Sequence, residues 1–323
     1  MPKIRTKRNA TRSGQTVPTK SLASRVGKQL RQYWILYAMI IPVVAYFIIF
    51  HYVPMYGVTL AFKDYKVKLG ILDSPWAGLK HFKRFFSSHN FGMLMSNTLG
   101  ISIYSLLVGF PIPIIFALML NYLQSQRLKK VVQMVSYAPH FISTVVICSM
   151  LTIFTATDTG IFNIIGKLLG RESVNLLSKP EWFQSIYVWS GVWQGMGWDA
   201  IIYLAALSGV DHEIHEAAML DGAGIFKRII HIDLPSIAPT IIMLLILRMG
   251  SLMGVGFEKV FLLQNDLNYK TSSVISTYVY EVGLIKSDFS FSTAVGLFNN
   301  VINVILLVGA NLFSKKVFKE SLW

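Results

Sequence analysis

Two stretches of the sequence contain residue types that could do chemistry, but neither has the spacing that the chemistry needs. Gly160 and Gly166 resemble a phosphate-binding loop, but five residues separate them and a leucine follows Lys167 where a Ser or Thr should bind magnesium. His212 and His215 flank a glutamate as in zinc-protease helices, but they are one position too close to share the helix face that a metal needs. The sequence therefore predicts no catalytic residue, no metal site and no cofactor, and the protein is not expected to be an enzyme.

A polar segment rich in small residues, 211–235, lies between two long apolar runs. Asp211 suits the N-cap of a short helix, and the acids after it suit the positive end of the helix dipole. Gly222 is expected to break this helix, and a second short element over 225–232 is expected to end at Pro235, which opens the next apolar run. The pattern predicts that 211–235 forms a projecting helical segment, called the knob, that binds a partner protein. A solvated surface helix on a large loop is the alternative. The acids of the knob are Asp211, Glu213, Glu216 and Asp221.

Polar residues also occur inside the apolar runs, where they are costly and usually face a cavity or a partner. Asp199 and Arg248 stand near the middle of their runs, so we expect them either to pair or to face water in a cavity separately. Aromatic rings beside amide groups suit a saccharide, because rings stack on C–H surfaces while amides bond hydroxyls; packing between helices is the alternative. The candidate residues that line such a pathway are Trp193, Gln194, Trp198, Asp199, Arg248, Asn299, Asn300 and Asn303.

The elements that hold these residues are apolar and long. Of 323 residues, 53% are hydrophobic and 14% are charged, whereas a soluble domain carries about 25% charged residues. A helix needs roughly 20 apolar residues to cross a bilayer. We therefore predict an all-α polytopic membrane protein with six transmembrane helices. The expected spans are 33–53, 97–120, 131–154, 184–207, 236–262 and 289–313.

Basic residues set the expected orientation, because cytoplasmic segments carry an excess of Lys and Arg. This excess falls on the side of the N-terminal arm, 1–32, so both termini are expected in the cytoplasm. The net charge of +14 does not indicate a nucleic-acid partner, because the basic arm precedes an apolar span and its attraction to membrane lipid explains it. We expect a basic, partly disordered arm over 1–32 and one six-span domain over 33–323 that includes the loop 211–235. Cys148 is the only cysteine, so no internal disulfide can form.

Two external segments carry further patterns. In 56–96, aromatic residues alternate with basic ones at helical spacing, which favours either an interfacial helix on the outer leaflet or packing against the ends of other spans. The segment 264–288 has an apolar, β-branched middle, which would suit a loop that closes over a cavity or receives a soluble partner.

The polar segment resembles the EAA loop of permease subunits in binding-protein-dependent ABC importers. That pattern of Glu-Ala-Ala, three residues, Gly and then Ile-x-Leu-Pro stands here as Glu216-Ala217-Ala218, Gly222 and Ile232-Asp233-Leu234-Pro235, with Asp221 before the glycine. Other segments resemble the carbohydrate-uptake, maltose-type branch, and are most similar to its oligosaccharide and polysaccharide members, including lipo-oligosaccharide-type and alginate-type permeases. These segments are Tyr56-Gly57 with 61–65, 76–82, and Tyr137-Ala138-Pro139.

The resemblance implies a division of labour in a bacterial cytoplasmic (inner) membrane. A soluble solute-binding protein captures the saccharide, two permease subunits that are expected to differ form the pathway, and two ABC ATPase subunits hydrolyse ATP. It also implies that the loop docks on an ATPase through the coupling residues Glu216, Ala217, Ala218, Asp221 and Gly222. Two other functions remain open from the residues themselves: an ion-coupled secondary transporter, for which Asp199 is the candidate acid, and a non-transport membrane scaffold.

Overall fold

The computed structural model describes residues 31–170 and 172–322, so most of the basic arm predicted over 1–32 lies outside the described residues. The chain divides into two units, Met1–Gly57 and Val58–Trp323, which are described separately. The described part of the first unit is helical. It contains α2 (Trp34–Phe47), a π-helical turn η1 (Ile48–Tyr52) and α3 (Val53–Met55).

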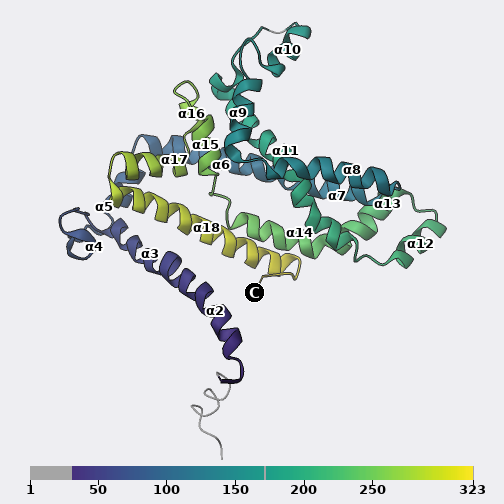
Figure 1. Cartoon of the computed structure of the whole chain (residues 1–323), viewed down its shortest axis with the longest axis horizontal. Coiled ribbons are helices and arrows are strands. Elements are labelled where there is room, and N and C mark those ends of the chain that lie inside the picture. Colours follow the sequence, from purple (N-terminus) through teal and green to yellow (C-terminus); the bar gives the residue numbers. More distant parts are fainter. Residues whose placement is uncertain (1–30, 171, 323) are drawn as a thin grey trace, which may run out of the picture. The chain divides into compact units, whose positions relative to one another are not determined.

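The second unit is a bundle of long helices joined by short ones (Figure 1). Its long helices are α6 (Asn90–Gly109), α7 (Pro111–Asn121), α8 (Gln126–Tyr137), α9 (Thr144–Phe154), α11 (Pro180–Leu207), α14 (Leu234–Met249) and α18 (Phe289–Val317). Its shorter helices are α4 (Gly70–Asp73), α5 (Lys80–Phe86), α10 (Ile161–Leu168), α12 (His212–Leu220), α13 (Ile225–Arg228), α15 (Phe257–Leu263), α16 (Tyr269–Ser272) and α17 (Ile275–Tyr280). Single turns complete it: η2 (Tyr56–Phe62, which begins in the first unit), η3 (Ala138–Phe141), η4 (Leu176–Ser178), η5 (Ile229–Asp233) and η6 (Glu281–Ile285).

The apolar helices confirm an all-α polytopic membrane protein. Among the described residues, four helical runs are long and apolar enough to cross a bilayer: Trp34–Phe62, Asn90–Asn121, Ile225–Met249 and Phe289–Val317. A fifth is counted if the bent pair Gln126–Phe141 and Thr144–Phe154 forms one span. Helix α11 has 28 residues, about 42 Å, which is long enough to span, but its Trp, Gly and Gln residues lower its hydropathy. The predicted count of six spans therefore stays a prediction.

Two predicted spans differ from the helices in the structure: one is bent, and the other begins and ends at different residues. The run 131–154 is not one helix, because η3 and α9 meet at an angle of 98°. The run 236–262 begins earlier and ends earlier than expected. Its helix starts at Ile225, passes through Pro235 without ending, and stops at Met249. The π-helical turn η5 ends two residues before this proline, whose missing N–H interrupts the ordinary ladder of backbone hydrogen bonds.

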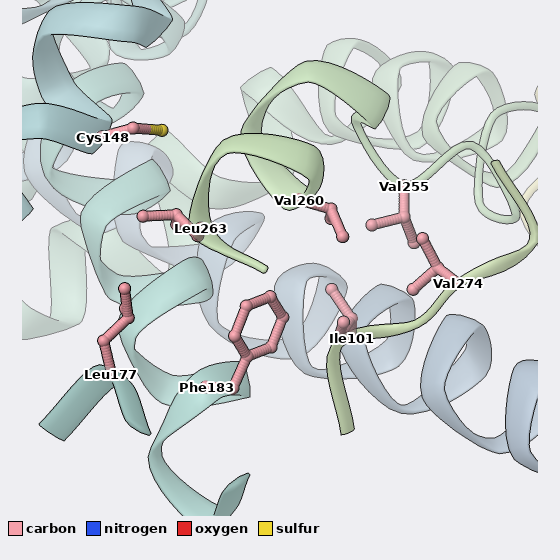
Figure 2. Close-up of a cluster of buried hydrophobic side chains, with 8 residues drawn as sticks. All are labelled: Ile101, Cys148, Leu177, Phe183, Val255, Val260, Leu263 and Val274. Carbon is pink, nitrogen blue, oxygen red and sulfur yellow. The ribbon is translucent and has the colours of Figure 1, made fainter. Parts of the chain in front are cut away.

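Helix α11 lies at the centre of the second unit and packs against α6, α7, α8 and α14. One buried cluster joins α11 to α6, α9 and the segment before α17. Figure 2 shows its members around Phe183 and Ile101, which are fully buried, with Val260 and Val274 facing them from α15 and the segment before α17. A second cluster joins α7, α11 and α14 around Ala117. These clusters hold α11 in a fixed position relative to its neighbours.

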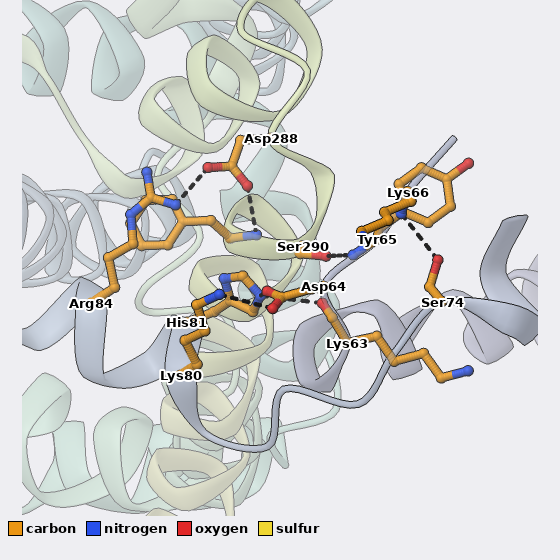
Figure 3. A network of polar contacts seen from close by, with 11 residues as sticks. Lys63, Asp64, Tyr65, Lys66, Ser74, Lys80, His81, Arg84, Asp288 and Ser290 are labelled. Atoms are coloured by element: carbon orange, nitrogen blue, oxygen red, sulfur yellow. Dashed lines mark hydrogen bonds and ion pairs between the residues drawn. The ribbon is translucent and has the colours of Figure 1, made fainter. Parts of the chain in front are cut away.

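Residues 63–84 form a polar network with the start of α18 (Figure 3). Lys80 and His81 contact the carboxylate of Asp64 at 2.8 and 3.0 Å, and the hydrogen bond from Lys80 lowers the pKa of Asp64 below its usual value. Arg84 donates to Asp288 at 2.7 Å. Arg84 ties α5 to the residue before α18, and the backbone N–H of Tyr65, which donates to the hydroxyl of Ser290 at 2.9 Å, ties the segment before α5 to the first turn of α18.

The segments 56–96 and 264–288 both contain residues that pack against other helices. The buried ring of Phe85 in α5 contacts Phe291 and Phe298 of α18 edge to face, so α5 packs against another helix as one of the two alternatives had it. The β-branched middle of 264–288 is not a mobile cover, because Val274 and Ile275 are fully buried in the core.

The crossing of α8 and α11 supplies a stability prediction. A Cβ on Gly197 would lie 2.3 Å from the backbone oxygen of Ser136, so Gly197→Ala forces the two helices apart. We expect a loss of about 1–3 kcal/mol of stability, as for other overpacked contacts. The measurement is the thermal midpoint of the purified protein in detergent.

The matched control is Gly296→Ala in α18, because a Cβ there meets no atom within 4 Å. This control should leave the midpoint unchanged or raise it, since alanine favours a helix over glycine. Equal midpoints for Gly197→Ala and Gly296→Ala would contradict the proposed role of the close crossing.

Candidate functional site

The candidate coupling helix is α12, and its first turn forms as the sequence predicts. Asp211 is the N-cap residue, and its Oδ1 accepts a hydrogen bond from the backbone N–H of Glu213 at 3.0 Å. The side chains of Glu213 and Glu216 are exposed. Glu213 lies in the first turn, at the positive end of the helix dipole, so its carboxylate stabilises the helix while remaining exposed.

The helix ends at the predicted glycine. Gly222 has φ +75°, a backbone conformation that glycine adopts without the strain that a Cβ brings. The N–H of Ala223 donates to the carbonyl of Ala218 at 2.8 Å, and that of Gly222 donates to the carbonyl of Met219 at 3.1 Å. These two bonds define a Schellman cap, which reverses the chain after α12. The second element is not separate, because α13, η5 and α14 continue as one helix from Ile225 to Met249.

Opposite faces of α12 have opposite roles. His215 is buried, whereas Glu213, Glu216 and Leu220 lie on the opposite face by the helical period of 3.6 residues. Leu220 is 90% exposed and Phe226, just after the bend, is 82% exposed. Large apolar side chains this exposed beside acids would suit a surface that binds a protein partner. The predicted coupling residues Glu216, Ala217, Ala218, Asp221 and Gly222 are all exposed or half-exposed on α12 and the bend after it.

The buried face of α12 contacts residues that are distant in the sequence. Asp233 in η5 is fully buried, and its Oδ2 accepts a hydrogen bond of 2.6 Å from the hydroxyl of Tyr122 at the end of α7. Its Oδ1 lies 3.2 Å from Nε2 of His215, within ion-pair distance but outside hydrogen-bond geometry. The guanidinium of Arg228 lies 5.3 Å from the centre of the Tyr122 ring. We call Tyr122, His215 and Asp233 the anchor cluster.

The anchor cluster keeps the Tyr122 hydroxyl protonated. Burial raises the pKa of Tyr122, and the hydrogen bond to Asp233 raises it further. The hydroxyl therefore remains a donor to the buried carboxylate at every physiological pH. Because its members come from α7, α12 and η5, the cluster connects the coupling helix to two long helices of the bundle.

Several predicted pathway residues line two adjoining cavities. A cavity of about 320 Å³ is lined by Gln194, Asp199 and Arg248 together with Lys259. A neighbouring cavity of about 420 Å³ shares Asp199 and Arg248 and adds Trp198. Both lie between α11 and α14 on the side of α6 and α7. The structure thus brings together four of the eight predicted lining residues.

Asp199 and Arg248 line the same cavities, but within residues 31–170 and 172–322 they form no ion pair. The predicted pairing is therefore not formed, and each faces the cavity separately. Trp198 stacks on the imidazole of His140 with ring centres 4.4 Å apart. Trp193 lines a different, mostly apolar cavity of about 450 Å³.

The three asparagines of α18 line none of these cavities. The side-chain oxygen of Asn303 accepts a hydrogen bond of 2.9 Å from the backbone N–H of Met253, in the irregular stretch after α14. Gln194 has a similar second role, because its amide donates to the carbonyl of Ile142 where η3 and α9 meet. An amide within a span can therefore bond the free backbone groups at a helix break, and not only a solute.

Sequence reasoning missed both the anchor cluster and Lys259. The anchor cluster joins Tyr122 and Asp233, which are 111 positions apart, so a single sequence gives no sign of their contact. Lys259 lay inside the predicted span 236–262, and a charge within a span was the signal that could have identified it.

Comparison with known proteins agrees with these features. The family described as "Binding-protein-dependent transport system inner membrane component" matches residues 109–319. The Protein LplB of Bacillus subtilis is 44% identical over 91% of this chain and 92% of its own length. The polygalacturonan/rhamnogalacturonan transport system permease protein YteP of the same organism is 42% identical over 94% of this chain and 95% of its own.

A solved structure shares the fold. A chain of a bacterial alginate ABC transporter in complex with an alginate pentasaccharide-bound periplasmic protein has a TM-score of 0.85 and 39% identity. The match covers 92% of this chain and all of that chain. The chain therefore belongs to the family of inner membrane components of binding-protein-dependent transport systems.

Proposed function

We propose that this chain forms one half of the translocation pathway of an ATP-driven importer for acidic oligosaccharides. The subunit does not hydrolyse ATP itself; a solute-binding protein delivers the saccharide, a second permease completes the pathway, and separate ATPase subunits supply the energy. The observation that carries the coupling part of the proposal is the exposed, acid-bearing α12, which is fixed at its buried face by the anchor cluster. A scaffold protein or an ion-driven carrier has no need for such a knob.

The substrate class is inferred from the relatives. Their names include polygalacturonan, rhamnogalacturonan and alginate, and alginate is an acidic polysaccharide. Uronic-acid chains present a carboxylate on each acidic ring together with hydroxyls and C–H faces. The cavities beside α11 combine basic, hydroxyl, amide and apolar groups, which suits such a chain.

The orientation follows from the coupling role. We infer that the coupling residues Glu216, Ala217, Ala218, Asp221 and Gly222 face the cytoplasm, where ATP is available. With six spans, both termini then lie on the same side. The distribution of Lys and Arg supports this orientation.

The central test is uptake of an oligogalacturonate into proteoliposomes that contain the assembled importer and its solute-binding protein. ATP-dependent uptake is expected, and Glu216→Lys should lower it by about tenfold or more, because reversing the charge of this exposed acid would disrupt the contact that it is proposed to make with the ATPase. The exposed external Glu172→Lys is the control and should transport normally. Uptake that needs an ion gradient but no ATP would exclude the proposal.

The bend after α12 supplies a second prediction. Gly222→Val places a β-branched side chain at φ +75°, which costs roughly 1–2 kcal/mol and favours a different chain direction. We expect uptake to fall while the subunit still inserts and assembles. The ratio of ATP hydrolysed to saccharide imported should rise, and this ratio is the measurement.

Gly224→Val is the matched control, because it lies two residues away, has φ −67° and ψ 169°, and offers open space for a side chain. It should keep the wild-type ratio. If both valine variants changed the ratio equally, the bend at Gly222 would have no special role.

The anchor cluster supplies a third prediction. Tyr122→Phe removes the hydroxyl that donates to the fully buried Asp233, and the loss of a hydrogen bond to a charged group costs about 1.5–3 kcal/mol. We expect α12 to detach more readily from the bundle, with faster proteolysis in the loop and more ATP hydrolysed per saccharide. Tyr280→Phe, which keeps its ring contacts with Phe257 and Phe261, is the control. Unchanged coupling in Tyr122→Phe would refute the anchoring role.

A further inference from the structure

The cavity of about 320 Å³ contains more positive than negative groups. Arg248 and Lys259 line it, and Asp199 is the one acid among its lining residues. Neither cation forms an ion pair with a described residue. The neighbouring Glu258 is exposed and is not part of the lining. Charges inside a membrane protein are costly and usually mark a pathway. Because two cations and one acid line this cavity, an anionic ligand would balance its charge.

We propose that Arg248 and Lys259 form a binding site for a carboxylate of the transported saccharide. The proposal rests on the proposed import of acidic oligosaccharides and assigns the recognition of the acidic group to two residues of this chain. It differs from the coupling site, because the cavity lies between α11 and α14, away from α12.

Arg248 supplies free donors. It lies in the last turn of α14, where the helix dipole favours a cation. Its guanidinium carries five N–H donors and makes no hydrogen bond or ion pair with the described residues, although Asp199 lines the same cavity. A planar guanidinium fits a carboxylate with two parallel hydrogen bonds.

Lys259 is held in place with donors to spare. Its Nζ donates to the carbonyl of Tyr187 at 2.9 Å and lies 4.8 Å from the centre of the Tyr187 ring. An ammonium has three donors, so this bond leaves two for a ligand. A Cβ on Gly191 would lie 3.4 Å from Nζ, so the glycine leaves room beside the ammonium group.

A purely structural role explains Lys259 less well. The bond to Tyr187 does join the segment of α15 to α11. The same connection is already made by Gly256, whose backbone N–H donates to the hydroxyl of Tyr187 at 3.1 Å. A second bond from a half-buried cation adds a desolvation cost to a contact that a neutral side chain could make.

The remaining walls suit a sugar ring. Ser102, Ser105, Gln194 and Ser251 offer groups for hydroxyls. Ile101 and Val255 form an apolar wall, and both belong to the cluster in Figure 2. The volume lies within the range of roughly 300–1,000 Å³ that small-molecule sites occupy.

The first test measures the anion preference of the cavity without transport. Ser251→Cys is introduced together with Cys148→Ala, because Cys148 is the only native cysteine. The purified importer is treated with a sulfonate-bearing or a trimethylammonium-bearing thiosulfonate, and each rate is divided by that of a free thiol. We expect the anionic reagent to react about tenfold faster, because like charge repels the cationic reagent.

Arg248→Gln and Lys259→Gln should each reduce this preference, whereas the control Lys270→Gln, outside the lining, should keep it. An oligogalacturonate should protect the cysteine, and its fully methyl-esterified form of equal length should not. Equal protection by both saccharides, or a preference that neither glutamine variant changes, would overturn the proposal.

The second test separates this site from the proposed function. In proteoliposomes, Arg248→Gln and Lys259→Gln should lower oligogalacturonate uptake by about tenfold or more, and Arg248→Lys and Lys259→Arg should restore part of it. Both glutamine variants should still show ATPase stimulation by the loaded binding protein. Loss of that stimulation would indicate a structural role and overturn the proposal. If the wild-type importer takes up no saccharide, the proposed function fails, while the reagent preference tests the anion site independently.

Discussion

The constraint on which this structure depends is that backbone polar groups inside a membrane protein must find partners within the protein. An unbroken helix meets this need by itself, but the second unit contains several breaks. At several of these breaks a polar side chain from another helix supplies a partner. Gln194 donates to the carbonyl of Ile142, Asn97 donates to the carbonyls of Lys270 and Ser273, and Thr98 accepts from the N–H of Ile275.

This constraint separates structural polar residues from those free to bind a solute. Asn303 serves the backbone of Met253, so its amide is already engaged. Arg248 and two donors of Lys259 have no such task among the described residues. Arg248, Lys259 and Asp199 lie together around one cavity, which is the expected arrangement for a pathway that must exclude lipid and admit a hydrophilic chain.

The sequence predicted those features that depend on local pattern. The all-helical membrane fold, the N-cap at Asp211 and the chain reversal at Gly222 each follow from a few neighbouring residues, and the structure has them. The breaks in the third and fifth predicted spans were missed. A proline or glycine within an apolar run permits a continuous helix, a kink or a break, and contacts made by distant residues decide among them.

The same reasoning explains the partial success at the site. Asp199 and Arg248 were visible as charges within apolar runs, and both line the predicted cavity. Their separation could not be predicted, because it depends on the packing angle between α11 and α14. Likewise, the partnership of Tyr122 with Asp233 brings together the ends of two helices, and only the folded bundle shows it.

One helix joins the two sites. Asp233 immediately precedes α14 and Arg248 lies in its last turn, so about 22 Å of helix connects the anchor cluster to the cavity. A helix with a packed face resists bending more than a loop does, and α14 packs along both α11 and α18. A displacement of α12 would therefore reach Arg248 as a movement of the whole helix. We infer that α14 couples the exposed helix α12 to Arg248 in the cavity, and that the π-helical turn at its start is where the two movements can differ.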